Sequence, residues 1–269
     1  MVKKVSAYAA AALSIAALVA GCSSSQTDSG ATSSSAAASA TSEAITGDVT
    51  VFAAASLKST FTEIGAQFEK DNPGTTVTFN FAGSSDLVAQ LSQGAPADVF
   101  ASADTNNMTK AVDGGLVSGE PVDFATNTLT IVTPPGNPKG IASFADLAKP
   151  DVALVVCAPQ VPCGSATEKV EKATGVALTP VSEESAVTDV LGKITSGQAD
   201  AGLVYVTDAS GAGDKVTAIP FPESADAVNT YPIAALNEAG NPAAAEKFIE
   251  LVTGPRGQEV LSAAGFATP

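Results

Sequence analysis

The order of strand-like and helix-like segments constrains this chain more than any other feature of its sequence. From Asp48 onward, short runs rich in β-branched and aromatic residues alternate with longer segments whose apolar residues recur every three or four positions. The clearest helical segment carries Leu57, Phe61, Ile64 and Phe68, and this spacing places all four side chains on one helix face. A regular alternation of strands and helices predicts an α/β fold.

The same patterns predict where the elements lie. Strands are expected at residues 49–52, 76–81, 98–101, 128–133, 152–156, 201–206 and 230–236. The segments 128–133 and 152–156 are apolar enough to be buried parallel strands. Helices are expected after Ser56, after Gly83 and over 106–113, 164–174, 185–196, 242–253 and 255–264.

The first 21 residues have the composition of an export signal. Lys3 and Lys4 precede an apolar run over residues 7–20. This run is shorter than the about 20 residues that a membrane-spanning helix needs, so it fits a signal peptide. It ends in Leu-Val-Ala-Gly before Cys22, which resembles a bacterial lipobox, where the cysteine is acylated and becomes the mature N-terminus. The alternative is a plain signal peptide with an incidental cysteine.

Residues 22–44 are predicted to be a flexible tether. After Cys22 they consist almost entirely of Ser, Ala, Thr and Gly, which cannot bury enough apolar surface to offset the entropy of ordering. The globular part is expected to begin near Ile45. The prediction is a protein held by lipid on the extracytoplasmic side of the cell membrane, either in a periplasm or on the outer cell surface.

Composition argues against several classes of function. The formal net charge is −15, whereas a nucleic-acid-binding protein presents a basic surface to the phosphates. The chain has no histidine and no Gly-x-Ser-x-Gly motif, which disfavours a hydrolase. Asp98 and Asp104 lack a histidine or a tight carboxylate cluster beside them, so they are predicted to be caps and turns rather than ligands of a free metal cation. The sequence therefore predicts a protein that is not an enzyme.

Four segments share a strand end, a small or hydroxyl residue and a helix start: 55–56, 83–84, 163–164 and 185–187. A helix N-terminus has unpaired N–H groups and a partial positive charge, and a serine there adds a hydroxyl donor. In an open α/β sheet such turns lie together at the carboxyl edge of the strands. A single serine at a helix start is most often an ordinary N-cap, but four converging starts predict a binding protein with an anionic ligand.

Several motifs resemble one known family. Residues 51–57 (Val-Phe-Ala-Ala-Ala-Ser-Leu), 81–85 (Phe-Ala-Gly-Ser-Ser) and 94–104 (Gly-Ala-Pro-Ala-Asp-Val-Phe-Ala-Ser-Ala-Asp) are similar to the molybdate-binding proteins of ABC importers. Further matching motifs occur in the same order at residues 161–164, 202–205 and from 254 to 266. The resemblance extends from Asp48 to the C-terminus.

The resemblance implies a type II periplasmic-binding-protein fold, with two α/β lobes joined by a two-stranded hinge and the ligand in the cleft. Lobe I would comprise residues 45–127 and 222–269, and lobe II residues 128–221. The ligand would be molybdate or tungstate, delivered to the membrane permease of an ABC importer by a monomer that needs no cofactor. A binder of sulfate or another small oxyanion on the same fold is the alternative.

The resemblance also implies which residues bind the oxyanion. Ser56 and Ser84 would donate hydroxyl and backbone N–H bonds from lobe I. Cys163 and Val187 would donate backbone N–H groups from lobe II, and Tyr205 its phenolic hydroxyl. Many relatives carry alanine where this chain has Cys163, but a backbone donor survives that change. The molybdenum would be bound only as its oxyanion.

Cys157 and Cys163 are predicted to form a disulfide. They are six positions apart in a chain that the signal predicts to be exported to an oxidising compartment. Closing so small a loop is worth roughly 2 kcal/mol in the chain-entropy model. The bond would also hold the turn that presents the Cys163 N–H group.

Overall fold

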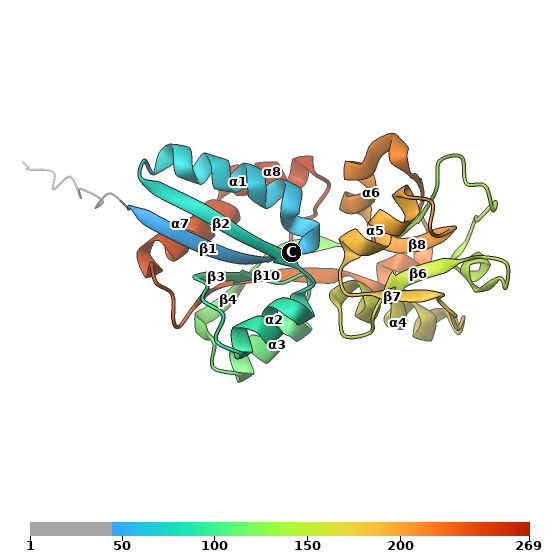
Figure 1. Cartoon of the computed structure of the whole chain (residues 1–269), viewed down its shortest axis with the longest axis horizontal. Coiled ribbons are helices and arrows are strands. Elements are labelled where there is room, and N and C mark those ends of the chain that lie inside the picture. The colour runs from blue at the N-terminus through green and yellow to red at the C-terminus, as the bar shows by residue number, and fades with distance from the viewer. Residues whose placement is uncertain (1–44) are drawn as a thin grey trace, which may run out of the picture. The chain divides into compact units, whose positions relative to one another are not determined.

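The computed structural model describes residues 45–269, in which the elements form two five-stranded sheets (Figure 1). The predicted signal peptide (1–21), the tether (22–44) and the lipidated Cys22 lie outside the described residues. Among the residues described, no helix has both the length and the apolar character to cross a membrane.

The first sheet is built around β1 (Gly47–Ala54), with the strand order β2-β1-β3-β10-β4. Strands β2 (Thr75–Ala82) and β3 (Val99–Ala101) run parallel to β1. Strand β10 (Asn229–Leu236) returns antiparallel to β3 and pairs with β4 (Val117–Asn127) at the edge. We call this sheet and its helices the first lobe.

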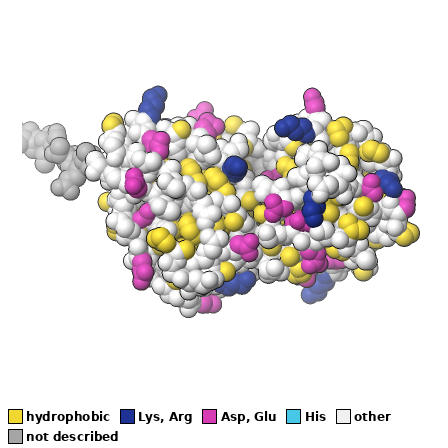
Figure 2. All heavy atoms as spheres, viewed as in Figure 1, with side chains coloured by type: hydrophobic (Ala, Val, Ile, Leu, Met, Phe, Trp, Pro, Cys, Tyr) yellow, Lys and Arg dark blue, Asp and Glu magenta, His cyan; other side chains and the backbone are white. Residues whose placement is uncertain are grey.

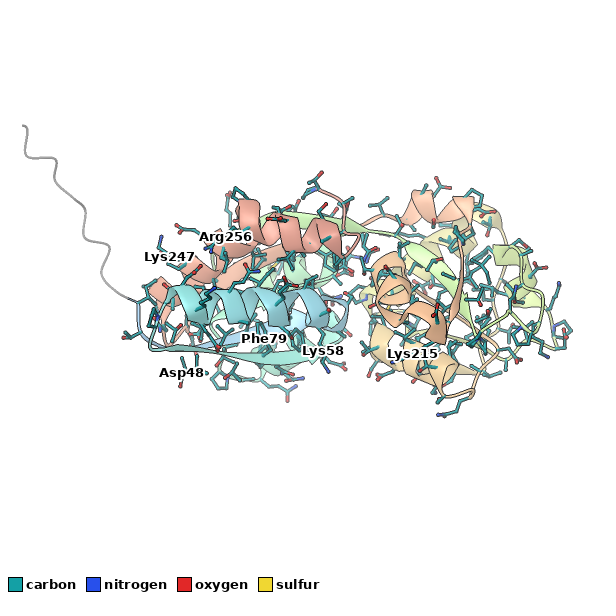
Figure 3. All side chains as sticks on the ribbon, turned by 90° about the horizontal axis from the view of Figure 1, so that it is seen from above. Asp48, Lys58, Phe79, Lys215, Lys247 and Arg256 are labelled. Carbon is teal, nitrogen blue, oxygen red and sulfur yellow. A yellow bond between two sulfur atoms is a disulfide. The ribbon has the colours of Figure 1, made fainter. Side chains whose placement is uncertain are left out.

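Helices cover both faces of the first sheet. Figure 1 shows α1 (Lys58–Asp71), α7 (Pro242–Thr253) and α8 (Pro255–Ala263) on one face, and α2 (Ser84–Ser92) and α3 (Thr105–Asp113) on the other. The predicted apolar face of α1 is confirmed: Leu57, Phe61, Ile64 and Phe68 are all buried. Phe79 of β2 packs edge-on against Phe61, on the side of the sheet that α1 covers (Figure 3).

The second sheet has the order β7-β6-β8-β5-β9, and we call it and its helices the second lobe. Its strands are β5 (Leu129–Thr133), β6 (Leu154–Cys157), β7 (Ser182–Glu184), β8 (Ala201–Tyr205) and β9 (Thr217–Ile219). Its α-helices are α4 (Pro162–Thr174), α5 (Val187–Thr195) and α6 (Val206–Ala212). The 3₁₀ turns of the chain are η1 (Ala55–Leu57), η2 (Phe144–Ala148), η3 (Gly213–Lys215) and η4 (Pro222–Ala227).

The prediction of a parallel strand is right for residues 152–156 and wrong for residues 128–133. Strand β6 is parallel to β7 and β8, as expected, but β5 is antiparallel to both β8 and β9. All five residues of β5 are buried, and a strand buried on both faces gives a continuous apolar run whichever way it points. Its direction is set by β4, which leads straight into it from the first sheet.

Two connections join the sheets. The chain leaves the first sheet between Asn127 and Leu129 and returns between Ile219 and Asn229. On the return, η4 packs against α4 and β5 of the second sheet. The predicted lobe boundaries, at 127/128 and 221/222, fall in these connections and stay a prediction. On the face that Figure 2 shows, acidic side chains are scattered and Lys and Arg side chains stand singly among them.

Candidate functional site: a small cavity between helix starts

The five residues predicted to bind the oxyanion line one cavity between the two lobes. Ser56 lies in η1, directly before α1, and Ser84 is the first residue of α2. Cys163 and Val187 lie in the first turns of α4 and α5, and Tyr205 ends β8. The space between them and their neighbours is about 200 Å³ including open solvent, and the centre of a water molecule fits in only about 10 Å³ of it. Its size suits a small ion rather than a sugar or a peptide.

The first turns of these helices place N–H groups that have no partner within their own helix beside the cavity. The N–H groups of Asp86, Ser165 and Asp189 donate to the carbonyls of Gly83, Val161 and Ala186. The N–H groups of Ser84, Cys163 and Val187 precede these, at positions that no carbonyl of their own helix reaches. Three helix N-termini therefore offer donors and partial positive charge to one small space.

The two serines are not N-caps, contrary to the most ordinary interpretation of a serine at a helix start. The N-cap of α2 is Gly83, the residue before η1 is Ala54, and neither element has a side-chain cap hydrogen bond. Ser84 Oγ instead accepts from Ala103 N at 3.0 Å, and Ser56 Oγ lies 3.1 Å from Tyr231 OH. Their hydroxyl groups therefore belong to the cavity wall rather than to the helix ends.

Burial keeps the phenol of Tyr205 protonated. The side chain is 1% exposed, and burial, followed by the nearby Tyr231 and Asp104, raises its pKa well above the ordinary value of a tyrosine. Asn229 Nδ2 donates to Tyr205 OH at 2.8 Å. A protonated phenol whose oxygen already accepts has its one proton left for the cavity.

Asp208 is the acidic residue that bonds to the backbone of Tyr205. Its carboxylate accepts from Tyr205 N at 3.1 Å. Burial raises its pKa to about 7, with the backbone hydrogen bond from Tyr205 acting in the opposite direction. Near neutral pH the carboxyl is therefore partly protonated, which weakens its repulsion of an anion in the cavity.

Cys157 and Cys163 form a disulfide in the structure, with their Cα atoms 5.6 Å apart. It joins the end of β6 to the first turn of α4, across the loop that carries Val161. In this turn Gly164 lies so close to the loop that a Cβ atom on it would be 2.0 Å from the carbonyl oxygen of Ala158. The short cross-link and the glycine together set where the Cys163 N–H group lies.

The two lobes touch directly beside the cavity. An ideal Cβ atom on Gly83, in the first lobe, would lie 2.0 Å from the carbonyl oxygen of Ser185 in the second. Asn229 Nδ2 donates to Ala103 O at 2.7 Å as well as to Tyr205 OH, and so contacts both lobes. The structure is thus that of closed lobes.

Of the two aspartates predicted to be caps and turns, Asp104 is a cap, whereas Asp98 instead bonds to the backbone of two distant segments. Asp98 accepts from Thr50 N and Asn241 N, and Asp104 caps α3 by accepting from Asn107 N. Within residues 45–269 no group of three or more Cys, Asp or Glu side chains is arranged to hold a metal ion.

Sequence reasoning missed Asn229 and Tyr231, which contact the hydroxyls of Tyr205 and Ser56. Both side chains are buried, at 3% and 0% exposure, on a strand that pairs with β3 and β4. An asparagine at the start of an otherwise apolar strand was the available signal, because buried amides require partners.

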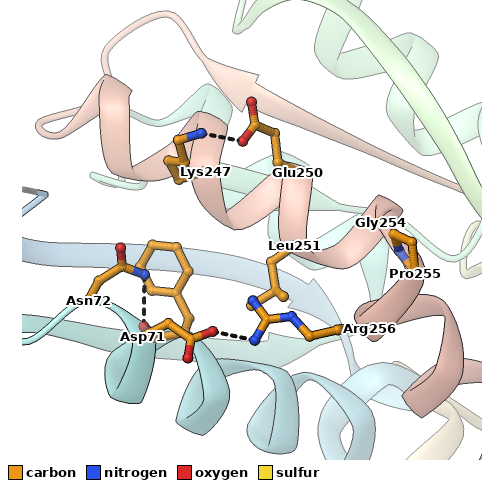
Figure 4. Close-up of a pocket in the computed structure, with 9 residues that line it drawn as sticks. Asp71, Asn72, Lys247, Glu250, Leu251, Gly254, Pro255 and Arg256 are labelled. Atoms are coloured by element: carbon orange, nitrogen blue, oxygen red, sulfur yellow. Dashed lines mark hydrogen bonds and ion pairs between the residues drawn. The ribbon is translucent and has the colours of Figure 1, made fainter. Parts of the chain in front are cut away.

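A larger pocket lies at the opposite end of α1 from Ser56 (Figure 4). It measures about 750 Å³, and its charged groups are already paired. Arg256 bonds to Asp71, and Lys247 to Glu250. Cations that are neutralised by carboxylates within the pocket leave little attraction for an anion, so the small cavity is the better candidate.

Two α/β lobes with a small donor-lined cavity between them define the class of extracytoplasmic solute-binding proteins. Comparison with known proteins agrees: the chain belongs to the family described as bacterial extracellular solute-binding protein, whose model matches residues 49–267.

Particular relatives narrow the comparison. The chain is 57% identical over 221 residues to the molybdate-binding protein ModA of Mycobacterium tuberculosis, covering 82% of this chain and 85% of that one. The solved periplasmic molybdate-binding protein of Azotobacter vinelandii is 24% identical with a TM-score of 0.71, covering 82% and 99%. The sulfate-binding protein SubI of Mycobacterium tuberculosis is 19% identical with a TM-score of 0.72, covering 83% and 87%. The two structures share the fold.

Proposed function

We propose that this protein captures molybdate, and tungstate equally, outside the cytoplasm and delivers it as a monomer to the permease of an ABC importer. The observation that carries the proposal is the cavity lined by Ser56, Ser84, Cys163, Val187 and Tyr205. The Mycobacterium tuberculosis relative, named as a molybdate-binding protein, supports the choice of ligand.

The donors of the cavity favour a fully ionised oxyanion. Backbone N–H groups only donate, and the hydroxyls of Ser84 and Tyr205 each already accept a bond from the protein. A dianion accepts every bond that such a site offers, whereas a protonated phosphate needs an acceptor for its own hydroxyl. Neutral donors hold the charge because closed lobes exclude water and strengthen each bond.

We infer no catalytic role. Cys163 is in a disulfide and is not available as a nucleophile. The chemistry of the cavity is binding, and the molybdenum enters and leaves as its oxyanion, without a resident metal or cofactor.

Calorimetric titration of the mature protein with molybdate, tungstate, sulfate and phosphate tests the function. Molybdate and tungstate should bind tightly and alike and should raise the melting temperature. Sulfate has the charge and shape of molybdate but is smaller, so it would leave some donors unpaired, at about 1–3 kcal/mol each. Sulfate and phosphate should therefore compete only at large excess. Comparable affinities for sulfate and molybdate would favour the alternative of a general oxyanion binder.

Removing the serine hydroxyls should weaken binding without unfolding the protein. Ser56→Ala and Ser84→Ala each delete one donor to a desolvated dianion, which costs about 1.5–3 kcal/mol, or about tenfold or more in affinity. Ser85→Ala is the matched control, because the Ser85 hydroxyl is buried beside the same helix start, has no hydrogen-bond partner and is not among the groups that line the cavity. Wild-type affinity in both test variants would remove the serines from the ligand set.

We also propose that the protein is anchored by lipid on Cys22. The lipobox-like sequence before Cys22 and the Ser/Ala-rich segment after it support this. One acyl chain binds a membrane only marginally, so more than one chain is expected. Cys22→Ser should move the protein from the membrane fraction to the soluble fraction, and retention of this variant in membranes would contradict the anchor.

A further inference from the structure

Strand β10 carries two buried polar side chains that contact ligand hydroxyls from behind. Asn229 and Tyr231 are two residues apart, so their side chains point to the same face of the strand. Asn229 contacts the hydroxyl of Tyr205, from the second lobe, and Tyr231 contacts the hydroxyl of Ser56, from the first. The strand thus reaches one ligand hydroxyl from each lobe.

The direction of the Asn229 bond follows from its other partner. The carbonyl oxygen of Ala103 can only accept, and it lies 2.7 Å from Asn229 Nδ2. The Asn229 amide must therefore direct its NH₂ group, and not its oxygen, toward Ala103 O. The same NH₂ group lies 2.8 Å from Tyr205 OH, so the phenol oxygen accepts and its proton is left for the cavity.

The bond between Tyr231 and Ser56 has a preferred direction too. A phenol donates more strongly than an aliphatic hydroxyl because its conjugate base is the more stable. Burial raises the pKa of Tyr231, so this side chain keeps its proton near neutral pH. With Tyr231 as the donor to Ser56 Oγ, the Ser56 proton is left for the cavity.

The hydroxyl of Ser84 is oriented in the same way, by a backbone N–H group. Ala103 N–H can only donate, and it bonds to Ser84 Oγ at 3.0 Å. All three ligand hydroxyls therefore accept one bond from the protein. Each has its single proton free for the ligand.

We propose that Tyr231 and Asn229 are positioning residues, which fix the hydroxyl protons of Ser56 and Tyr205 toward the cavity and so select a fully deprotonated oxyanion over a protonated one. This inference rests on the proposed function and deepens it. Neither residue touches the ligand. Each acts by orienting a ligand hydroxyl so that its proton, rather than a lone pair that could accept from hydrogen phosphate, faces the cavity.

A double-mutant cycle tests the proposal. Tyr231→Phe removes one oxygen and keeps the ring that packs against Phe124 and Phe266, so the variant should fold. Its molybdate affinity should fall about tenfold, because Ser56 is no longer held as a donor. In a Ser56→Ala background the same change should have a much smaller effect, since Ser56 Oγ is the hydrogen-bond partner of the Tyr231 hydroxyl. Asn229→Ser should behave in the same way toward Tyr205→Phe.

Selectivity supplies a second measurement. Competition by phosphate should become stronger relative to molybdate in Tyr231→Phe, because the freed Ser56 oxygen can accept from hydrogen phosphate. Thr230→Val is the matched control: it deletes a hydroxyl from the neighbouring residue of β10, whose side chain points to the other face of the strand. It should leave both affinities at the wild-type level.

The outcomes separate this inference from the proposed function. A wild-type protein that does not bind molybdate contradicts the function itself. If the wild type binds and Ser56→Ala weakens binding, but the effects of Tyr231→Phe and Ser56→Ala multiply, the positioning role is wrong. An equal loss of molybdate and phosphate affinity in Tyr231→Phe would also overturn it, because a merely structural residue lowers both together.

Discussion

Replacing Gly83 with alanine is expected to weaken molybdate binding by about a hundredfold or more while the protein stays folded. The added Cβ atom would lie 2.0 Å from the carbonyl oxygen of Ser185 across the cleft, far inside van der Waals contact. The backbone of Gly83 has φ −60° and ψ 140°, which alanine adopts without strain. The substitution therefore costs free energy only when the two lobes come together.

Lobes held apart by an ångström or more cannot complete the site. Ser56 and Ser84 belong to the first lobe, whereas Cys163, Val187 and Tyr205 belong to the second. Hydrogen bonds weaken steeply beyond their normal length, so the ligand would keep the donors of one lobe and lose those of the other. Two lost bonds to a dianion, at about 1.5–3 kcal/mol each, give the expected hundredfold loss or more.

The measurement is calorimetric affinity together with the melting temperature. The apo melting temperature of Gly83→Ala should equal that of the wild type or exceed it slightly, because alanine lowers the entropy of the unfolded chain. Gly192→Ala in α5 is the matched control, since a Cβ atom there meets no atom within 4 Å. Unchanged molybdate affinity in Gly83→Ala would mean that the lobes do not close onto each other at this contact when the ligand binds.

The helix starts could be predicted from the sequence because their signals are local. Ser84 and Val187 begin their helices in the structure, and Ser56 and Cys163 lie within one residue or two of a helix start. A strand end followed by a small residue and an amphipathic run identifies such a turn wherever the rest of the chain lies. The resemblance to a family then supplied which of these turns meet.

Other elements could not be predicted because their signals depend on neighbours. Strand β4 contains Gly119, Glu120 and Pro121, which are unfavourable within a strand. It tolerates them because it lies at the edge of the first sheet. The short strands β7 and β9 have three residues each and no fully buried side chain, so no apolar run marks them, whereas the equally short β3 is buried throughout.

The roles of Gly83 and Gly164 were equally hidden. In the sequence both are simply small residues beside a helix start. Each must be glycine because the backbone of another segment leaves no room for a Cβ atom. That segment is Ser185 for Gly83, and residues 157 and 158 for Gly164. Close approaches of this kind are set by tertiary packing, which no local pattern reports.

Gly164→Ala should be the most destabilising of the small substitutions at the site. The added Cβ atom would lie 2.0 Å from Ala158 O, 2.5 Å from Ala158 C and 2.7 Å from Cys157 O. All three are backbone atoms, and the Cys157–Cys163 disulfide ties the two sides of the contact together. Neither side can therefore withdraw without moving the end of β6 or the start of α4.

We expect Gly164→Ala to lower the free energy of unfolding by about 3 kcal/mol, the upper range for overpacking a tight site. For a domain of this size that corresponds to a melting temperature lower by about 10 °C. Molybdate affinity should fall as well, because the Cys163 N–H group moves with the first turn of α4.

The disulfide gives this prediction an internal control. In a Cys157→Ser/Cys163→Ser background the loop is no longer tied to α4, so Gly164→Ala should cost less there than in the wild type. The difference between the two costs, from chemical denaturation of the four proteins, measures how far the cross-link confines the turn. A melting temperature that Gly164→Ala leaves unchanged, or equal costs in the two backgrounds, would show that the loop relaxes freely and that the disulfide does not hold the Cys163 donor in place.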